Sequence, residues 1–375
     1  MPHENAFDPP ETIIYAWNRR AVDLKNAGGE PAKPGEPMNK PASSKENSGA
    51  ISRRSFVSAT GLAAGAVALG GAVDPLSALA ASAGGKLPRR VLGRTRLEVT
   101  CMTLGAAPCG IADDVSLEEV SQIVNLAIDL GINSIDTAPK YGRSEEGIGR
   151  ALGPRRKDVV LATKVWADTI AEAETSLANS LKTLKTDYVD ILYFHHLGER
   201  QVDKARDPDG VFTWLLKQKQ AGKCRFVGLS GHNLPGRFVP FLESGDVDVI
   251  LVAVNYADRH TYNFEESVLP VAKKHNTGIV AMKVFGGPDE KTGSWGTRKA
   301  KPRVGESNVE LAIRYALGVP GVATANLGVH TAEQLRQNVG FVERYRPLST
   351  TERDDTLKQG KEMAAQWGAH FGPVT

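Results

Sequence analysis

The 375-residue chain is poor in cysteine and in aromatic residues, and it carries almost no excess charge. Its three cysteines, Cys101, Cys109 and Cys224, are odd in number and widely spaced, with no CxxC pair, which argues against a disulfide framework or a zinc site. The formal net charge is +3 and no basic stripe with interleaved aromatic residues occurs, so we expect no nucleic-acid partner. With 41% hydrophobic and 24% charged residues, the composition is that of a globular protein.

Long runs of large apolar residues are also missing. Residues 1–51 are polar and rich in Pro, Gly, Asn, Lys and Glu, and we predict a disordered N-terminal extension there. From residue 52 the sequence reads SRRSFVSATGLAAGAVALGGAV, in which Arg53 and Arg54 precede an uncharged run of mostly Ala, Gly and Val. Such a run is poorer in Leu, Ile and Phe than a typical membrane-spanning helix.

Small residues follow this run and offer A-x-A cleavage sites at residues 78–80 and 81–83. Together with the SRRSF motif, they make residues 52–83 resemble a twin-arginine signal peptide. We therefore predict export through the twin-arginine translocation machinery to the periplasm or another extracytoplasmic compartment. A membrane anchor and a disordered tail are the alternatives, and the protein stays cytoplasmic if the signal is not used.

The position of the arginine pair also bears on the start codon. Fifty-two residues precede Arg53, whereas twin-arginine signals usually begin with a short polar segment. Met38 begins the segment MNKPASSKENSGAISRRSF, which has an ordinary length for such a signal. We hypothesise that translation starts at Met38 rather than at Met1. Mass spectrometry of the unprocessed product that detects residues 1–37 would contradict this.

From Lys86 onward, short apolar runs alternate with helical patterns. A hairpin around a Gly/Arg turn comes first, and eight strand–helix units follow in about 260 residues, which predicts a (β/α)8 TIM barrel over residues 86–347. The strands are continuous apolar runs, as expected for a parallel sheet buried on both faces. A doubly wound sheet is the alternative, but no GxGxxG follows the first strand. The expected strands are residues 100–105, 133–138, 159–166, 188–196, 225–231, 247–255, 278–287 and 321–329.

Two details complete the expected fold. The helix after the sixth strand is predicted as one segment over residues 264–276, FEESVLPVAKKHN. Residues 348–375 are predicted to form a helical tail that closes over the barrel and helps to shape the mouth of the pocket.

Polar residues stand at the ends of three consecutive strands. Asp136 ends the second strand, Tyr141 lies in the loop after it, Lys164 ends the third strand and His195 ends the fourth. Sites in such barrels gather at the C-terminal ends of the strands, so these four side chains should meet at one mouth. An ammonium stabilises a phenolate, a carboxylate keeps the lysine charged, and an imidazole can orient a carbonyl. The set is suited to protonating the oxygen of a carbonyl that accepts hydride.

Several stretches resemble motifs of the aldo-keto reductase family, in the same order along residues 87–345. They are VLGRTRLEVTCMTLG, IDTAPKYGRSEEGIGRAL, LATKVW, DYVDILYFHH and FVGLSGHN. The resemblance implies a (β/α)8 barrel, NADP or NAD as a dissociable hydride donor, a small aldehyde, ketone or sugar as substrate, and no metal. The chain has no cysteine in its C-terminal segment, so we expect no iron–sulfur cluster either. A non-catalytic, nicotinamide-binding redox sensor on the same barrel is the alternative function.

The resemblance also assigns roles to individual residues. Tyr141 matches the proton donor of the family, Lys164 and Asp136 match the pair that tunes it, and His195 matches the histidine that orients the substrate. His196 competes for that role, but the parity of the strand from Asp190 favours His195. The groups that hold the nicotinamide carboxamide match Ser230 and Asn255, and Trp166 matches an aromatic wall of the substrate pocket, although a tryptophan that only packs the loop is the alternative.

The adenosine-phosphate end of the cofactor site matches LGVHTAEQLRQN, residues 327–338, where a helix begins. Gly328, Gln334 and Asn338 fall at the matching positions. Many members of the family carry a lysine and an arginine where this chain has Gly328 and Gln334, so both NADP and NAD stay open, with His330 as a weak substitute. The basic loop of residues 293–307 could clamp the pyrophosphate or be a solvated surface loop, and its candidate clamp residues are Arg298, Lys299 and Arg303.

Overall fold

The computed structural model describes residues 87–375. The predicted N-terminal extension (1–51), the predicted signal peptide (52–83) and the hypothetical start at Met38 lie outside the described residues. Within residues 87–375, no helix is long and apolar enough to cross a membrane. The three cysteines are buried and unpaired.

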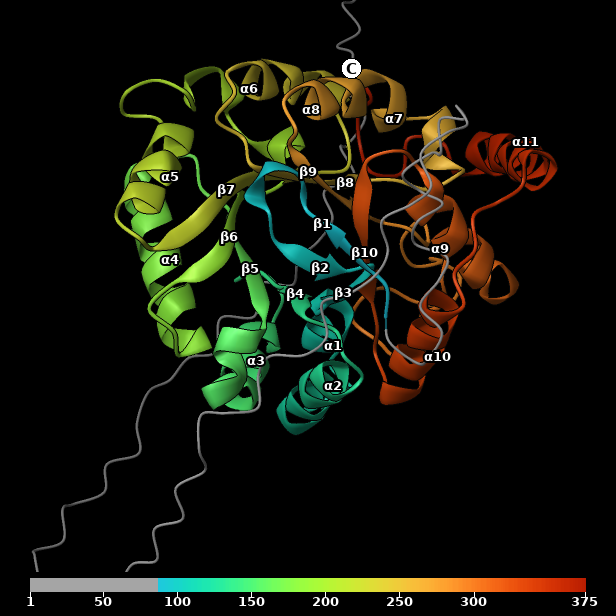
Figure 1. The fold of residues 1–375 in the computed structure, drawn as a ribbon, viewed down its shortest axis with the longest axis horizontal. Coiled ribbons are helices and arrows are strands. Elements are labelled where there is room, and N and C mark those ends of the chain that lie inside the picture. The colour runs from blue at the N-terminus through green and yellow to red at the C-terminus, as the bar shows by residue number, and fades with distance from the viewer. Residues whose placement is uncertain (1–86) are drawn as a thin grey trace, which may run out of the picture. The chain divides into compact units, whose positions relative to one another are not determined.

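Eight parallel strands form a closed barrel in the order β10-β3-β4-β5-β6-β7-β8-β9 (Figure 1). The prediction of a (β/α)8 barrel is therefore confirmed, and the doubly wound alternative is wrong. The strands are buried on both faces, which explains their unbroken apolar sequences. They are β3 (Met102–Gly105), β4 (Ser134–Asp136), β5 (Val160–Val165), β6 (Val189–Phe194), β7 (Cys224–Gly231), β8 (Val249–Ala253), β9 (Gly278–Met282) and β10 (Val322–Gly328).

Helices surround the barrel (Figure 1). Capping boxes open three of them, at Ser116, Thr169 and Ser349, and fix where α2, α4 and α11 begin. The helices are α1 (Ala107–Ile111), α2 (Leu117–Asp129), α3 (Ser144–Leu152), α4 (Ile170–Leu184), α5 (Val211–Gln220), α6 (Val239–Glu243), α7 (Phe264–Ser267), α8 (Leu269–Lys274), α9 (Val309–Gly318), α10 (Ala332–Glu343) and α11 (Thr350–Trp367).

The single helix predicted over residues 264–276 is wrong. The segment forms two helices, α7 and α8, with a break at Val268. Pro270 lies in the first turn of α8 and has no N–H to donate to a preceding turn, so a continuous helix would lose a backbone hydrogen bond there. Proline is tolerated in a first turn, where the N–H would be unpaired in any case.

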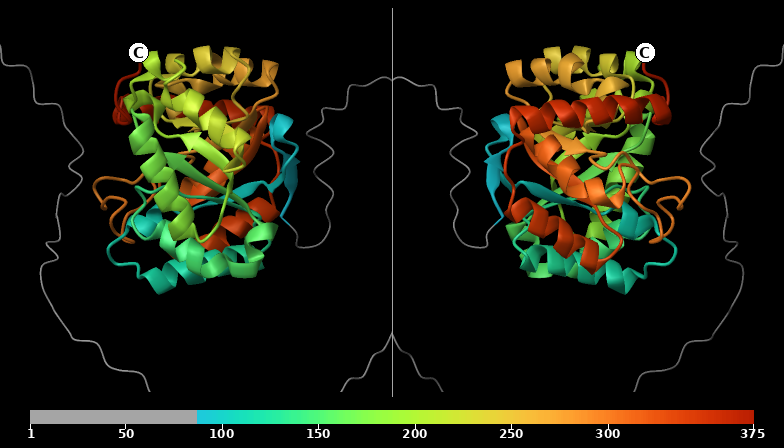
Figure 2. Two further views of the ribbon diagram at one scale, coloured as in Figure 1. Left: turned by 90° about the vertical axis from the view of Figure 1, so that its left-hand side faces the viewer. Right: turned by 90° about the vertical axis from the view of Figure 1, so that its right-hand side faces the viewer.

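The hairpin of β1 (Arg89–Val91) and β2 (Glu98–Thr100) closes one end of the barrel. Leu92, next to β1, is 1% exposed and packs with inward-facing residues of the barrel such as Val160 and Val249. Figure 2 shows this hairpin at the end opposite the long loop between β9 and α9, residues 283–305. The strands run from the hairpin end toward that loop, so their C-terminal ends open at the other end, which we call the mouth.

The C-terminal tail packs onto loops of the mouth. After α11, the backbone N–H of Phe371 donates to the Tyr262 hydroxyl at 2.6 Å, and that hydroxyl donates to the carbonyl of Gly372 at 3.2 Å. The backbone N–H of Leu234 donates to the carbonyl of Pro373 at 3.3 Å. The tail therefore lies over the loops that follow β7 and β8, where it can help to shape a binding site.

Candidate active site

Asp136 and Lys164 form a buried ion pair at the ends of neighbouring strands. Asp136 is the last residue of β4 and is 5% exposed, and Lys164 of β5 is 1% exposed. The ammonium donates to both carboxylate oxygens, at 2.8 and 2.7 Å, and to the carbonyl of Thr137 at 2.8 Å. A lysine this deeply buried would lose its charge without such partners, so the carboxylate is what keeps it protonated.

The pKa values of the pair follow from this geometry. Burial lowers the pKa of Lys164, but the charge of Asp136 and the interactions with Tyr141 outweigh it and hold that pKa above its ordinary value. Burial raises the pKa of Asp136, opposed by Lys164 and by a hydrogen bond from Asn326. The lysine is thus a permanent cation at neutral pH.

Tyr141 lies against this lysine, in the turn between β4 and α3. The Lys164 ammonium is 4.7 Å from the centre of the Tyr141 ring. Helix α1 supports the turn closely, because a side chain at Gly110 would come within 2.3 Å of the Tyr141 carbonyl oxygen. Burial raises the pKa of Tyr141, and this exceeds the lowering by Lys164. The lysine acts in the expected direction, but burial has the larger effect and the phenol remains protonated.

Asn326 belongs to the same cluster, although it was not predicted from the sequence. It lies in β10, and its side-chain Nδ2 donates to Asp136 at 3.0 Å. Its Oδ1 is buried without a hydrogen-bond partner. The only sequence signal was a polar residue near the end of the eighth strand, in ATANLGV. A buried amide oxygen left open at the mouth is a group that a ligand can satisfy.

His195 is the histidine that the structure brings to Tyr141. The two ring centres are 5.9 Å apart and the rings are nearly perpendicular, at 86°. His196 turns away through a left-handed backbone, with φ of 56°, and stacks on Trp166. Burial lowers the pKa of His195 well below its usual range, and positive neighbours, Lys164 first among them, lower it further. His195 is therefore neutral, and its buried Nδ1 has no hydrogen-bond partner.

Trp166 lies beside both histidines. Its ring centre is 5.2 Å from that of His195 and 5.4 Å from that of His196, and the Arg200 guanidinium lies 4.5 Å from it. Arg200 is in turn bound to Asp168 at 3.0 Å. The indole is thus held in place between the loops after β5 and β6.

Ser230 and Asn255 were both predicted to hold the carboxamide of the cofactor. Ser230 of β7 is 1% exposed, and its hydroxyl oxygen accepts the backbone N–H of His196 at 3.2 Å. The amide of Asn255 is fully used within the protein. Its Nδ2 donates to Asp258 at 2.6 Å and to the Lys283 carbonyl at 2.9 Å, and its Oδ1 accepts the N–H groups of Ala257 and Asp258 at 3.0 and 2.8 Å. The geometry gives Asn255 a structural role.

The residues expected near the adenosine phosphate lie around the start of α10. Thr331 caps this helix, because its hydroxyl oxygen accepts the backbone N–H of Gln334 at 3.2 Å. The side-chain oxygen of Gln334 in turn accepts the backbone N–H of His330 at 2.8 Å. Asn338 is buried one turn further along, at 4% exposed. A side chain at Gly328 would meet the ring of Pro108 at 2.6 Å, so no lysine fits at this position.

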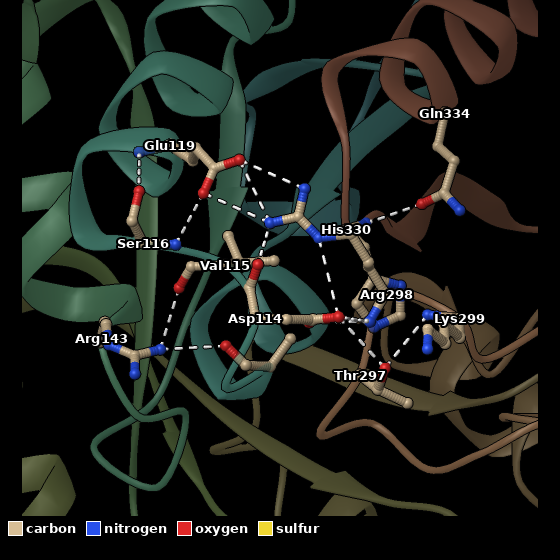
Figure 3. Close-up of polar contacts among 11 residues, drawn as sticks. Asp114, Val115, Ser116, Glu119, Arg143, Thr297, Arg298, Lys299, His330 and Gln334 are labelled. Carbon is tan, nitrogen blue, oxygen red and sulfur yellow. Dashed lines mark hydrogen bonds and ion pairs between the residues drawn. The ribbon is translucent and has the colours of Figure 1, made fainter.

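The loop of residues 283–305 is anchored to the loop before α2 by Arg298 (Figure 3). The guanidinium contacts the backbone carbonyl of Asp114 and lies 3.2 Å from the Glu119 carboxylate, and the Arg298 backbone N–H donates to the Asp114 carboxylate at 3.0 Å. Of the other candidate clamp residues, Lys299 is exposed and Arg303 pairs with Glu290 at 2.6 Å. Arg298 and Arg303 are thus engaged within the loop system rather than open to a pyrophosphate.

Metal ligands do not gather at this mouth. Across residues 87–375, no group of three or more His, Cys, Asp or Glu side chains is arranged to hold a metal ion. The mouth offers a buried ion pair, a protonated phenol and a neutral imidazole.

Comparisons with known proteins agree with this geometry. The model of the aldo/keto reductase family matches residues 101–291. L-galactose dehydrogenase of Arabidopsis thaliana is 30% identical over 288 residues, which are 68% of this chain and 88% of the plant protein. A solved aldo-keto reductase from Bacillus halodurans shares the fold, with a TM-score of 0.60 and 23% identity over 76% of this chain and 99% of its own.

A second solved structure, an aldo/keto reductase from Klebsiella pneumoniae in complex with NADP and acetate, has a TM-score of 0.58 and 21% identity over 72% of this chain and 95% of its own. The resemblance seen in the sequence is thus confirmed by the family model, by a curated relative and by the fold. The chain belongs to the aldo/keto reductase family and is an NAD(P)H-dependent oxidoreductase.

Proposed function

We propose that this chain reduces a small aldehyde, ketone or sugar to the alcohol, with Tyr141 as the proton donor. The contact of Tyr141 with the buried Lys164–Asp136 pair and with His195 carries the proposal. The bound nicotinamide supplies the hydride. The chain's own task is then to hold the carbonyl and to protonate the oxygen that becomes an alkoxide.

Tyr141 is suited to this task because burial keeps it protonated while Lys164 stabilises the phenolate that remains after transfer. The cation is held at the phenol by Asp136, which is itself held by Asn326. Since the charge of Lys164 is already in place, little reorganisation is needed when the proton leaves. His195 contributes as a neutral imidazole, which can hydrogen-bond the carbonyl without competing for the proton.

Several residues fit a dinucleotide at this mouth. Ser230 lies buried beside the histidines, and the backbone N–H groups at the start of α10 favour an anion. The Nε2 of His330, next to that helix, is buried without a partner and could meet a phosphate. The choice between NADPH and NADH rests on this end of the site, where Gly328 packs on Pro108 and the Gln334 side chain is bound to the backbone of His330.

The Tyr141→Phe variant tests the proposal. It should bind NADPH or NADH as tightly as the wild type and lose roughly 10²- to 10⁴-fold in kcat, because only the transferable proton is removed. Cofactor binding is measured by fluorescence titration, and turnover by nicotinamide absorbance with a panel of aldehydes, ketones and sugars. The measurement also compares the affinities for the two nucleotides.

A matched control is Tyr193→Phe, because that phenol is also buried near Lys164, with its ring centre 6.0 Å from the ammonium. It should keep most of its turnover. Unchanged turnover in Tyr141→Phe would overturn the assignment of the proton donor. Cofactor binding by the wild type without turnover on any carbonyl would favour the redox-sensor function instead.

A further inference from the structure

Lys283 presents a cation at the mouth that has no anionic partner. It directly follows β9, and its ammonium lies 4.8 Å from the ring centre of Trp295 and 5.2 Å from that of Phe371. No carboxylate within residues 87–375 lies at ion-pairing distance from it. Burial lowers the pKa of Lys283 to about 8, against a more distant charge on Asp258. At neutral pH the side chain is still a cation, held between two aromatic faces.

The backbone that carries this lysine is fixed. Lys283 has a φ of 53°, a left-handed conformation that residues other than glycine rarely adopt. Its carbonyl accepts hydrogen bonds from the Asn255 side chain at 2.9 Å and from the N–H of Gly286 at 2.8 Å. The structural role of Asn255 is thus to hold the turn that points Lys283 into the mouth. Strained backbone of this kind is typical of functional sites.

A continuous wall of rings connects Lys283 with His195. The ammonium lies on the ring of Phe371. The ring centre of Phe371 is 4.8 Å from that of His232, which is 4.2 Å from that of His196. His196 stacks on Trp166, whose edge meets His195. The cation therefore stands at the far end of the same wall that begins beside the proton donor.

This wall is polar, and the Glu199 carboxylate lies 3.4 Å from the Nδ1 of His196 at its middle. The Nδ1 atoms of His195 and His232 are buried without hydrogen-bond partners. The charged side chains that act on these two imidazoles are cations in each case: Lys164, Arg200 and Lys140 at His195, and Lys283 at His232. An apolar aldehyde would leave these groups unsatisfied, which is costly in a buried site. A substrate with oxygens and a negative charge would satisfy them.

We propose that Lys283 is a specificity residue that binds a carboxylate or phosphate group of the substrate, so that the preferred substrates are anionic, oxygen-rich carbonyl compounds. This rests on the proposed reduction at Tyr141 and names the class of compound reduced there. The carbonyl lies at Tyr141 and His195, and the anionic group extends along the ring wall to Lys283. His232 and His196 offer ring nitrogens to the atoms between them.

The position of Trp295 favours a substrate over a cofactor phosphate as the source of the anion. Its backbone is hydrogen-bonded to His330, at the start of α10, while its ring covers Lys283. Trp295 thus contacts both Lys283 and His330, the residue beside the expected phosphate end. The other face of the ammonium is covered by Phe371, which belongs to the ring wall and to the tail.

The test compares matched carbonyl pairs in the wild-type protein and in Lys283→Met. The pairs are 4-carboxybenzaldehyde with benzaldehyde and D-glucuronate with D-glucose, in which one member carries a carboxylate. In the wild type, kcat/KM should favour the anionic member by about 10- to 100-fold, as expected for a hydrogen bond to a charged group. Lys283→Met should abolish this ratio through a higher KM for the anionic member, and Lys283→Arg should restore most of it.

Two further measurements make the result specific. Lys291→Met removes an exposed lysine of the same loop and should leave the ratio unchanged. Fluorescence titration of NADPH and NADH should give the same Kd for Lys283→Met as for the wild type. Equal kcat/KM for both members of each pair in the wild type would overturn the proposal. A weaker cofactor Kd in Lys283→Met, with both members affected alike, would also overturn it and assign the anion to the cofactor. If the wild type turned over none of the four carbonyl compounds, the proposed reductase function itself would be overturned.

Discussion

The two ends of the barrel handle charge in opposite ways. At the hairpin end, Asp190 pairs with Arg156 at 2.9 Å and with Arg225 at 2.7 Å, and Asp248 pairs with Arg94 of the hairpin turn at 3.2 Å. Both carboxylates also accept a backbone N–H from a neighbouring strand. At this end buried acids have full sets of partners, as expected of groups that only stabilise the fold.

At the mouth, one ion pair is complete and the groups around it are open. Lys164 and Asp136 satisfy each other, but within residues 87–375 no carboxylate pairs with Lys283, and His195 and Asn326 each keep a buried polar atom without a partner. In (β/α)8 barrels the C-terminal ends of the strands carry function and the N-terminal ends carry stability. Here the same division appears as unpaired against paired polar groups, so substitutions at the two ends should have different consequences.

The largest effect is expected at the mouth, from Lys164→Met. Removal of the ammonium leaves the buried Asp136 carboxylate unpaired and takes the stabilising charge away from Tyr141. We expect kcat to fall roughly 10²- to 10³-fold and the free energy of unfolding to fall by about 3–5 kcal/mol. Steady-state kinetics measure kcat, and urea unfolding measures the free energy of unfolding. The double variant Asp136→Asn/Lys164→Met should recover much of the stability but none of the activity, and recovery of activity would contradict the role given to the lysine.

A substitution at the hairpin end should affect stability alone. Asp190→Asn removes the charge that pairs with the largely buried Arg156 and should cost about 3 kcal/mol in the free energy of unfolding. The kcat of the folded enzyme should stay within about twofold of the wild type, because a substitution at one end of the barrel acts independently of groups at the other end with which it shares no partner. A loss of kcat comparable to that of Lys164→Met would show that the two ends are coupled and would break the comparison.

The smallest expected effect concerns pH. Burial lowers the pKa of His196 to about 4, against about 6.5 in the unfolded chain. A histidine with a depressed folded pKa contributes stability that is present above pH 6.5 and is lost as the pH falls toward 4. At pH 5 this loss amounts to about 2 kcal/mol. Urea unfolding at pH 7.5 and pH 5 should therefore show a steeper decline for the wild type than for His196→Gln.

The comparison with His196→Gln is needed because Asp258 acts in the opposite sense. Burial raises the pKa of Asp258 to about 7, so the stability that it contributes is lost as the pH rises from about 4 toward 7. The two groups titrate in overlapping windows, and the wild-type profile reports the sum of these and the other buried titratable groups, such as His195. If the difference in the free energy of unfolding between the wild type and His196→Gln does not change with pH, the assignment of a neutral, buried His196 is wrong.

Much of this site could be predicted from local sequence. Asp136, Lys164 and His195 stand at the ends of apolar runs, and the period of the strands places consecutive strand ends at one mouth. The choice of His195 over His196 followed from strand parity, because neighbouring residues of a strand face opposite sides. The helix starts at Ser116 and Thr169 are also local features, because capping boxes involve residues three apart.

Other features depend on residues far apart in the chain. Asn326 reaches Asp136 across 190 positions, and Phe371 reaches Lys283 only because the tail folds back over the mouth. Asn255 fits the expected cofactor position by sequence, but its neighbours in space use all of its hydrogen-bonding capacity. Gly328 is restricted by Pro108, which no local pattern indicates.

The sequence by itself thus determined the barrel, the strand ends and the types of residue that stand there, because hydrophobic period, capping and strand parity act over a few neighbouring residues. The tertiary structure decided the balance of burial and charge that keeps Tyr141 protonated and Lys164 charged. It also decided that Lys283 faces the mouth without an anion while Arg298 is tied to Asp114. The reason is physical: pairing and desolvation depend on which atoms meet in space, and the closure of the barrel brings together loops that are distant in sequence.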